Sequence, residues 1–305
     1  MTENTINNED FCTGRRYGST LELNTRKASH ITSIKKIDKF NYCDLRTGEL
    51  KKYHLNPSKS SISNLHNVKA TMRKLRRLIA VNFDNQNLKK SALWLTLTYS
   101  DNMRDNDQLR VDLKAFFNKL FHFIHSKRKN LTWISVVEPQ SRGSFHVHIL
   151  IKFNNFNKVL FLPNKCVRNL WGHGFVNVQR ISQTKNNALS RYLSTYLTDV
   201  LIDDNKGTED SSIHSSSLFT ERKVKHNKRV IKGARLYLYK KNMNIYRHSQ
   251  YISREIVVVN SKKNILRFFN LDVKDLKSTF FKSFNIETSK GWNYKYCIEY
   301  LNVNT

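Results

Sequence analysis

The stretch that decides the fold reads EPQSRGSFHVHILI and covers residues 138–151. It has the pattern of a strand, a tight turn and a second strand. Side chains at positions i and i+2 of a strand lie on one face, so we expect His146 and His148 side by side. The apolar residues that alternate with them would lie on the opposite face. Two neighbouring imidazoles of this kind can hold one metal ion.

Glu138 can join this pair if the two strands form a hairpin. With a loop at 139–143, Glu138 would lie opposite Ser144. Directly opposite residues share a face, so Glu138, His146 and His148 would converge on one side of the sheet. Two imidazoles and one carboxylate would leave metal positions open for water and substrate oxygens. The alternative is a structural histidine pair beside a glutamate that only ends a strand.

Two tyrosines, Tyr192 and Tyr196, lie on a segment, 186–201, whose apolar spacing predicts a helix. They border the apolar stripe that should face the sheet. A phenol with a pKa of about 10 is a weak nucleophile, but a nearby cation and a metal-polarised phosphate would activate it. With the histidine pair, this indicates cutting and rejoining of DNA. The alternative is two tyrosines that cover the edge of the core. Asp199 could assist proton transfer or could be an ordinary polar residue.

The composition favours a nucleic-acid partner. The 305 residues include 53 Lys and Arg against 24 Asp and Glu, a net charge of +29. Such a surplus usually meets a polyanion, although a generally basic surface is the alternative. The sequence has no apolar run long enough to span a membrane and no signal-peptide core at its N-terminus. Its four dispersed cysteines suit free thiols in a reducing cytoplasm.

Periodicity predicts the remaining elements. We expect strands at 92–99, 131–138, 144–153, after Gly172, at 252–259 and at 294–301; helices at 61–81, 108–126, 164–171 and shortly after 261; and a hairpin at 36–55.

These elements suggest three regions: a tail and hairpin at 1–60, whose first 28 residues we expect to be loosely attached, a core at 61–260 and an extension at 261–305. A polar, Ser-rich stretch at 203–218 predicts a mobile loop within the core. Basic residues of the core are candidates for DNA contact, with a solvated surface as the alternative. They are Arg73, Lys74, Arg76, Arg77, Arg142, Lys232 and Arg235.

Three blocks, in this order, resemble the motifs of rolling-circle replication initiators, which are His-hydrophobic-His (HUH) endonucleases. They are LTLTY at 95–99, the segment 138–148, and YLSTY at 192–196. Two flanking stretches, WGHGFVNV at 171–178 and KGARLY at 232–237, are similar to plasmid and phage replication proteins of low-GC Gram-positive bacteria. The resemblance covers residues from about 60 to 255.

The resemblance implies an α+β fold, in which a central antiparallel sheet of about five strands has helices packed on one face, preceded by an N-terminal hairpin-helix region. It implies that Glu138, His146 and His148 hold Mg²⁺ or Mn²⁺. It also implies that Tyr192 or Tyr196 attacks one DNA strand at an origin. The products are a 5′-phosphotyrosine and a 3′-OH primer, and the second tyrosine could rejoin DNA at termination.

The implied partners are single-stranded or cruciform origin DNA and a host helicase and polymerase in the bacterial cytoplasm. The sequence has no GxxxxGK[ST] loop, so unwinding would fall to the host. One departure concerns Thr195 and Asp199, which stand where many two-tyrosine members carry lysine. Arg191 or a residue of the basic loop could replace that cation. Alternatives are a relaxase or transposase with the same chemistry, a non-catalytic DNA-binding regulator, and a single-strand binder that stacks bases on aromatic residues.

Overall fold

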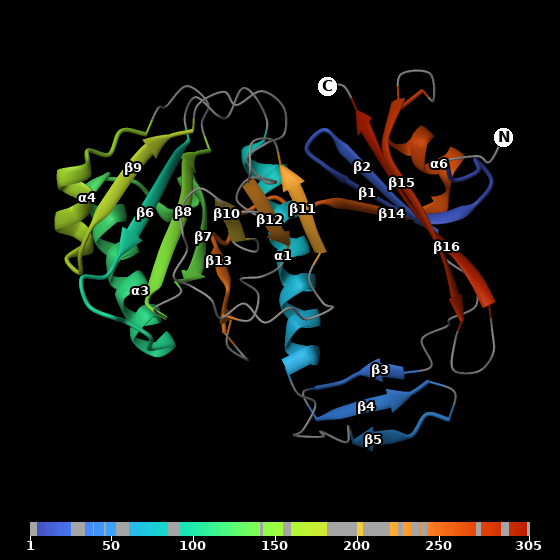
Figure 1. Ribbon diagram of the computed structural model, residues 1–305, viewed down its shortest axis with the longest axis horizontal. Coiled ribbons are helices and arrows are strands. Elements are labelled where there is room, and N and C mark those ends of the chain that lie inside the picture. The colour runs from blue at the N-terminus through green and yellow to red at the C-terminus, as the bar shows by residue number, and fades with distance from the viewer. Residues whose placement is uncertain are drawn as a thin grey trace. The chain divides into compact units, whose positions relative to one another are not determined.

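The computed structural model (Figure 1) divides the chain into two compact units. One consists of residues 61–254, and the other combines residues 1–60 with residues 255–305. The structure describes residues 5–25, 34–38, 40–45, 47–52, 61–84, 92–140, 143–154, 160–181, 200–203, 220–224, 228–232, 238–239, 243–272, 276–287 and 293–303.

The larger unit is built on a five-stranded antiparallel sheet with the order β13-β7-β8-β6-β9. Its strands are β6 (Leu93–Thr98), β7 (Leu131–Pro139), β8 (Phe145–Phe153), β9 (Val176–Arg180) and β13 (Tyr246–His248). The predicted α+β class, with a central antiparallel sheet, is confirmed. The edge strand β13 was missed because three residues are too few to show a periodic pattern.

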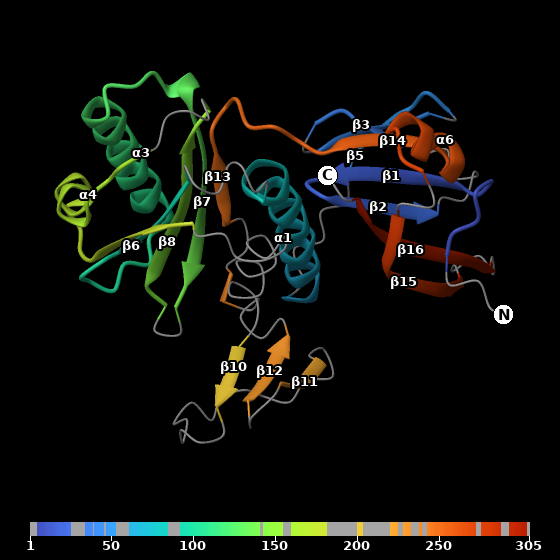
Figure 2. The same cartoon turned by 90° about the horizontal axis from the view of Figure 1, so that it is seen from above.

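Two helices, α3 (Asn106–Phe123) and α4 (Asn164–Trp171), lie on one face of this sheet (Figure 2). The carboxylate of Asp105 caps α3 by accepting the backbone N–H groups of its first turn. The aromatic stripe of α3 packs against the inward side chains of β6 and β8, as expected. This core includes Leu93, Leu95, Leu97, Phe116, Phe117, Leu120, Val147, Ile149 and Trp171. A short 3-10 turn, η1 (Arg128–Asn130), leads from α3 into β7.

Helix α1 (Ser61–Phe83) covers part of the opposite face of the sheet (Figure 2). Its buried residues pack against Ile134, Val136 and Leu150, which alternate with the residues of the first core. This is also the face of His148, because His148 and Leu150 are two positions apart on β8. The helix of the predicted hairpin-helix region therefore lies on the side of the sheet that carries the histidines.

The hairpin of β7 and β8 forms, but its predicted register is wrong by two residues. Glu138 pairs with His146, not with Ser144, and the last pair is Pro139 with Phe145. The turn is closed by a hydrogen bond from the N–H of Gln140 to the carbonyl of Ser144. Because strand side chains alternate with a period of two, a shift of two leaves every side chain on its predicted face.

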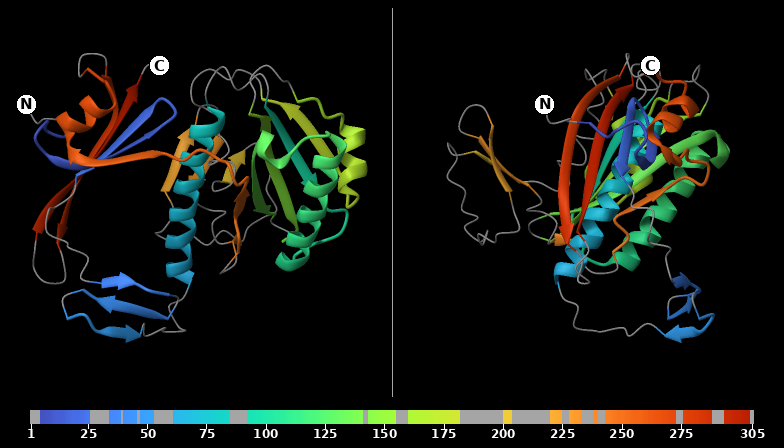
Figure 3. Two further views of the ribbon diagram at one scale, coloured as in Figure 1. Left: turned by 180° about the vertical axis from the view of Figure 1, so that it is seen from behind. Right: turned by 90° about the vertical axis from the view of Figure 1, so that its right-hand side faces the viewer.

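The second unit contains another five-stranded antiparallel sheet, with the order β14-β1-β2-β16-β15. Its elements are β1 (Phe11–Tyr17), β2 (Thr20–Thr25), β14 (Ile256–Ser261), α6 (Lys262–Phe268), β15 (Leu276–Glu287) and β16 (Asn293–Val303). The long strands β15 and β16 run side by side in both views of Figure 3. The expected C-terminal strand and short helix are confirmed.

The expectation that the first 28 residues are loosely attached is wrong for β1 and β2. Their side chains Leu21 and Leu23 are fully buried against Ile265 and Leu301 from the C-terminal segment. The ammonium of Lys262 is also buried, 2.9 Å from the carboxylate of Glu299. The two terminal regions, which the sequence predicted as separate, thus share one sheet and one core.

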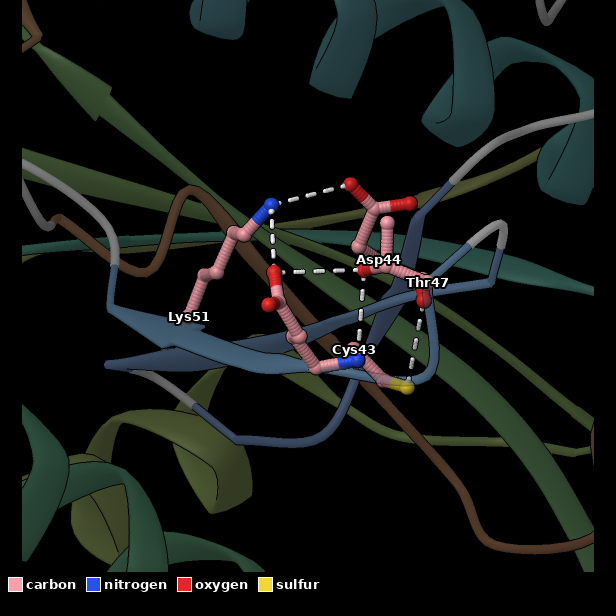
Figure 4. Close-up of polar contacts among 5 residues, drawn as sticks. Cys43, Asp44, Thr47 and Lys51 are labelled. Carbon is pink, nitrogen blue, oxygen red and sulfur yellow. Dashed lines mark hydrogen bonds and ion pairs between the residues drawn. The ribbon is translucent and has the colours of Figure 1, made fainter.

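The predicted hairpin at 36–55 belongs to a three-stranded sheet of β3 (Ile34–Lys36), β4 (Asn41–Asp44) and β5 (Leu50–Lys52). Figure 4 shows the turn between β4 and β5. The ammonium of Lys51 lies 3.2 Å from Asp44 and 3.1 Å from Glu49. Hydrogen bonds to Glu49 and then to Asp44 raise the pKa of Lys51.

A third small sheet in the larger unit pairs β12 (Lys228–Lys232) with β10 (Val200–Asp203) and β11 (Thr220–Val224). The predicted helix at 186–201 lies outside the described residues except for its last two, which belong to β10 and not to a helix. The predicted mobile loop also lies outside them, apart from its first residue. Among the described helices, none combines the length and the apolar character needed to cross a membrane. All four cysteines are free.

Candidate active site

Glu138 and His148 form a buried contact on the α1 face of the sheet. The Nε2 atom of His148 lies 2.8 Å from Oε2 of Glu138, although the two residues are on different strands. Glu138 is 3% exposed and His148 is 4% exposed, so water does not weaken this interaction. The sequence-predicted convergence of these two side chains is therefore present in the structure.

The other ring nitrogen of His148 is held by β6. The indole N–H of Trp94 donates to Nδ1 of His148 at 3.2 Å, and Oγ1 of Thr96 lies 3.3 Å from the same atom. An indole nitrogen can only donate, so Nδ1 acts as the acceptor and the ring proton lies on Nε2, facing Glu138. The ring of Trp94 also meets His148 edge-on, with centroids 5.7 Å apart. Trp94 and Thr96 thus fix the orientation of His148.

His146 lies on the same face but is only half-buried. It pairs with Glu138 across β7 and with Thr98 across β6. Its Nδ1 lies 3.2 Å from the side-chain nitrogen of Gln140, in the hairpin turn. The centroids of the His146 and His148 rings are 6.5 Å apart. Gln140 therefore positions His146 much as Trp94 positions His148.

The donor atoms of this face suit a divalent cation in part. Adjacent ligands of an octahedral ion about 2.1 Å from each donor are about 3 Å apart, close to the 2.8 Å between His148 and Glu138. Two imidazoles in adjacent positions would have centroids roughly 4.5–5 Å apart, so the ring of His146 would have to turn inward. Accordingly, no three His, Cys, Asp or Glu side chains of the described residues form a metal-holding group as they stand.

Hydrogen bonds to the two rings are compatible with metal ligation. A histidine that binds a metal through Nε2 donates its Nδ1–H to a neighbouring acceptor. Oγ1 of Thr96 lies 3.3 Å from Nδ1 of His148 and can take that role. The amide of Gln140 can present its oxygen to His146 after a flip, since amide oxygen and nitrogen are interchangeable in such a site. Trp94 would have to give up its bond to His148.

The predicted catalytic tyrosines, Tyr192 and Tyr196, lie outside the described residues, as do Arg191, Thr195 and Asp199. Their distance from the histidines stays a prediction.

The structure places some of the predicted DNA-contacting residues. Arg73 and Lys74 are exposed on α1, whereas Arg76 and Arg77 are half-buried there. Lys232 ends β12. Arg142 and Arg235 lie outside the described residues. The four α1 residues therefore belong to the helix that packs on the histidine face.

Residues 92–200 match the model of a family described as replication-associated protein, of the ORF2 type. The matched segment covers about a third of the chain. It includes the Glu138–His148 pair, the strands that hold it, and both predicted tyrosines. No curated protein and no solved structure matches the chain. The match supports a role in DNA replication.

The matched segment also contains a polar cluster that sequence reasoning missed. The hydroxyl of Tyr99 donates to Asp112 of α3 at 2.8 Å, and Gln108 donates to the other oxygen of that carboxylate at 2.8 Å. Burial, and then the bond to Asp112, raises the pKa of Tyr99 far above its usual value. Nε2 of His173 lies 3.7 Å from Asp112. Tyr99, the last residue of the LTLTY block, therefore anchors the end of β6 to α3.

The direct partners of the histidines were missed too. Trp94, Thr96 and Thr98 alternate on β6, and this alternation placed them on one face of a strand. The order of the strands was the missing information. Once β6 is known to pair with β8, the same alternation puts Thr96 opposite His148.

Proposed function

We propose that the protein is a rolling-circle replication initiator that nicks one strand of origin DNA and later rejoins it. The observation that carries this proposal is the buried contact between Glu138 and His148, with His146 on the same face. This contact lies inside the segment that matches a replication-associated family. The basic composition and the order of the tyrosine block after the histidine block support the same function.

In the proposed reaction, the phenolic oxygen of Tyr192 or Tyr196 attacks a DNA phosphorus atom. A bond forms between this oxygen and phosphorus, and the bond from phosphorus to the 3′-oxygen breaks. The phenol loses its proton, and the departing 3′-oxygen gains one to become the 3′-OH primer. Rejoining reverses these steps, with a 3′-OH attacking the phosphotyrosine. The 5′ end of the cut strand stays attached to the protein in between.

The side chains of β6, β7 and β8 would prepare the site for this attack. Glu138, His146 and His148 would hold Mg²⁺ or Mn²⁺, which supplies Lewis-acid polarisation of the scissile phosphate. Trp94, Thr96 and Gln140 orient the two rings through the hydrogen bonds described above. The partners we propose are single-stranded or cruciform origin DNA, and a host helicase and polymerase in the bacterial cytoplasm.

Covalent capture of DNA tests this function. Single-stranded oligonucleotides tiling the DNA that replicates with this gene are incubated with the protein and Mn²⁺, then resolved in denaturing detergent. A 3′-terminal fluorophore should migrate with the protein, because the cut leaves the 5′-phosphate on tyrosine, and a 5′-terminal fluorophore should be released. The adduct should disappear in the variant that carries both Tyr192→Phe and Tyr196→Phe. A protein-bound 5′ fluorophore would contradict the assigned polarity.

The histidine face is tested with the same oligonucleotide. His148→Ala and His146→Ala should each lower the nicking rate by roughly 100-fold or more, since even outer-shell partners of metal sites affect activity 10–100-fold. DNA affinity should change little, because Lys and Arg contacts to phosphates supply most of it. His122→Ala, which removes an exposed histidine of α3, is the matched control. Wild-type nicking by the His148 variant would refute the assignment of this face.

A second candidate is a non-catalytic DNA-binding regulator on the same scaffold. It is favoured by one observation, which is that the described residues hold no ready metal-binding group while α1 displays exposed basic residues. Such a protein would bind duplex DNA tightly but form no covalent adduct with any oligonucleotide. A relaxase or transposase would form the adduct on a different DNA, so the sequence of the captured strand separates it from an initiator.

A further inference from the structure

A pocket of about 350 Å³ lies in the larger unit, between α3 and the sheet edge formed by β7 and β13. Its walls come from the outer side of α3, from η1, from Trp133 on β7 and from the segment 247–251. Trp133 lies on the α3 face of the sheet, whereas Glu138 lies on the α1 face. The two residues are also five positions apart along β7, which is about 16 Å. The pocket is therefore separate from the candidate active site.

The walls of the pocket are positively charged. Arg110, Lys114, Arg128 and Arg247 line it, and no carboxylate is among the lining residues that the structure describes. Arg110 has an acidic neighbour in Asp107, 3.8 Å away on the same helix, but this carboxylate is almost fully exposed and offsets little of the charge. Arg128 donates to Asn118 and lies over the ring of Phe121. Four cations around one cavity favour an anionic ligand.

Arg247 lacks a partner for one of its donors. Its Nη1 atom is buried and makes no hydrogen bond to any described residue. Burial, and then the nearby guanidinium of Arg110, lowers the pKa of Arg247. A buried donor without an acceptor costs free energy, and two close guanidinium groups repel each other. A phosphate oxygen in the pocket would relieve both costs, because a guanidinium binds phosphate through paired N–H groups.

The pocket also offers aromatic surfaces. The rings of Phe117 and Trp133 are stacked, with centroids 4.0 Å apart and planes 28° apart. Phe117 is buried, but Trp133 is only half-buried, and Tyr251 is 61% exposed at the pocket rim. Base stacking on aromatic rings is the usual way in which proteins hold single-stranded nucleic acid without reading its sequence.

We propose that this pocket binds one nucleotide of single-stranded DNA, with its phosphate on Arg247 and Arg110 and its base against Trp133 or Tyr251. The volume is near the lower end of ligand pockets and suits a single nucleotide, not a duplex. This inference rests on the proposed function only in naming DNA as the source of the nucleotide. It assigns the strand a second holding point, away from the site of cutting.

Two double variants test the charge of the pocket. Arg110→Ala with Lys114→Ala removes two exposed cations that line it, and Lys119→Ala with Lys129→Ala removes two exposed cations nearby that do not. Binding of a fluorescent single-stranded oligonucleotide is measured over a range of salt concentrations. We expect the pocket variant to bind about tenfold more weakly, and the slope of log K against log salt to fall by about 1.4, since each contact to a single strand contributes about 0.7. The control variant should match the wild type.

Photocrosslinking locates the base. An oligonucleotide that contains 5-iododeoxyuridine is irradiated with the wild-type protein, and the attached peptide is identified by mass spectrometry. The expected attachment is at Trp133 or Tyr251, reduced by excess deoxynucleoside monophosphate but not by inorganic phosphate. Competition by both compounds alike would show a phosphate site without base recognition and would overturn the proposal.

Equal salt slopes in the two double variants, or crosslinks only at other residues, would also overturn it. The proposed function fails by a different result, which is the absence of a covalent adduct with wild-type protein. Failure of the pocket and failure of the nuclease are therefore distinguishable.

Discussion

Lys152 is a buried cation on the same strand and face as His148. It is 6% exposed, and its ammonium lies 5.5 Å from the centre of the Phe83 ring of α1. Burial lowers the pKa of Lys152 to about 8. The unfolded chain, in which lysine has a pKa near 10.4, therefore binds this proton more tightly than the folded protein does. At neutral pH the charged lysine destabilises the fold.

We predict from this that Lys152→Met makes the protein more stable at pH 7, by about 1–3 kcal/mol of unfolding free energy. In the wild type, this residue should make stability rise as pH increases from about 8 to about 10.5, because only the unfolded state then holds the proton. The rise should be absent in Lys152→Met. Urea denaturation at pH 7 and pH 9.5 measures both effects, with exposed Lys119→Met as control. A variant less stable than the wild type at pH 7 would contradict the prediction.

At the scale of elements, the turn between α4 and β9 clamps the end of β6. The N–H of Ser100 donates to the carbonyl of His173 at 2.8 Å, and the indole of Trp171 donates to the carbonyl of Thr98 at 2.8 Å. Gly174 has a φ of +153°, and a β-carbon there would lie 2.6 Å from the backbone of both Ser100 and Thr98. These backbone atoms are fixed by the sheet. The strand end that faces His146 therefore depends on the absence of a side chain at 174.

This turn offers a matched pair of substitutions. Gly172 also has a positive φ, of +75°, but a β-carbon there would meet nothing within 4 Å. Gly172→Ala should cost about 1–2 kcal/mol, the penalty of a left-handed conformation alone. Gly174→Ala should cost roughly 3 kcal/mol or more, because a clash with backbone adds to the strain. Thermal denaturation compares the two variants, and equal losses of stability would show that the close approach at 174 is unimportant.

At the scale of the whole molecule, the two ends of the chain build one unit. β2 pairs with β1 on one side and with β16 on the other, so Leu21 pairs with Leu301. β1 in turn pairs with β14. An isolated two-stranded hairpin is marginal in water, and β1 and β2 alone could not keep their leucines buried. The N-terminal strands therefore require the C-terminal segment in order to fold.

Truncation after Arg254 tests this dependence. Amide hydrogens of residues 11–25 should be protected from exchange in the full chain and should exchange rapidly in the truncated chain. The sheet of β6, β7 and β8 should keep its protection, because both of its cores lie within residues 61–254. Continued protection of residues 11–25 without β14 and β16 would contradict the prediction.

Much of the larger unit could be predicted because its elements obey local rules. Alternation on β6, β7 and β8 and the apolar spacing of α1 and α3 depend only on residues a few positions apart. The same local rule placed Glu138, His146 and His148 on one face, and this survived a register that was wrong by two. The tyrosine block was predicted from spacing and resemblance, and its position relative to the histidines stays a prediction.

By itself, the sequence determined the strands and helices of the larger unit and the shared face of its histidines, since period and alternation are properties of neighbouring residues. Only the tertiary structure decided which distant segments meet. It put Trp94 against His148, α1 over the histidine face, Arg247 beside Arg110, and β2 against β16. The physical reason is that contacts between distant segments depend on how whole elements pack, and a local pattern of apolar residues is compatible with many such packings.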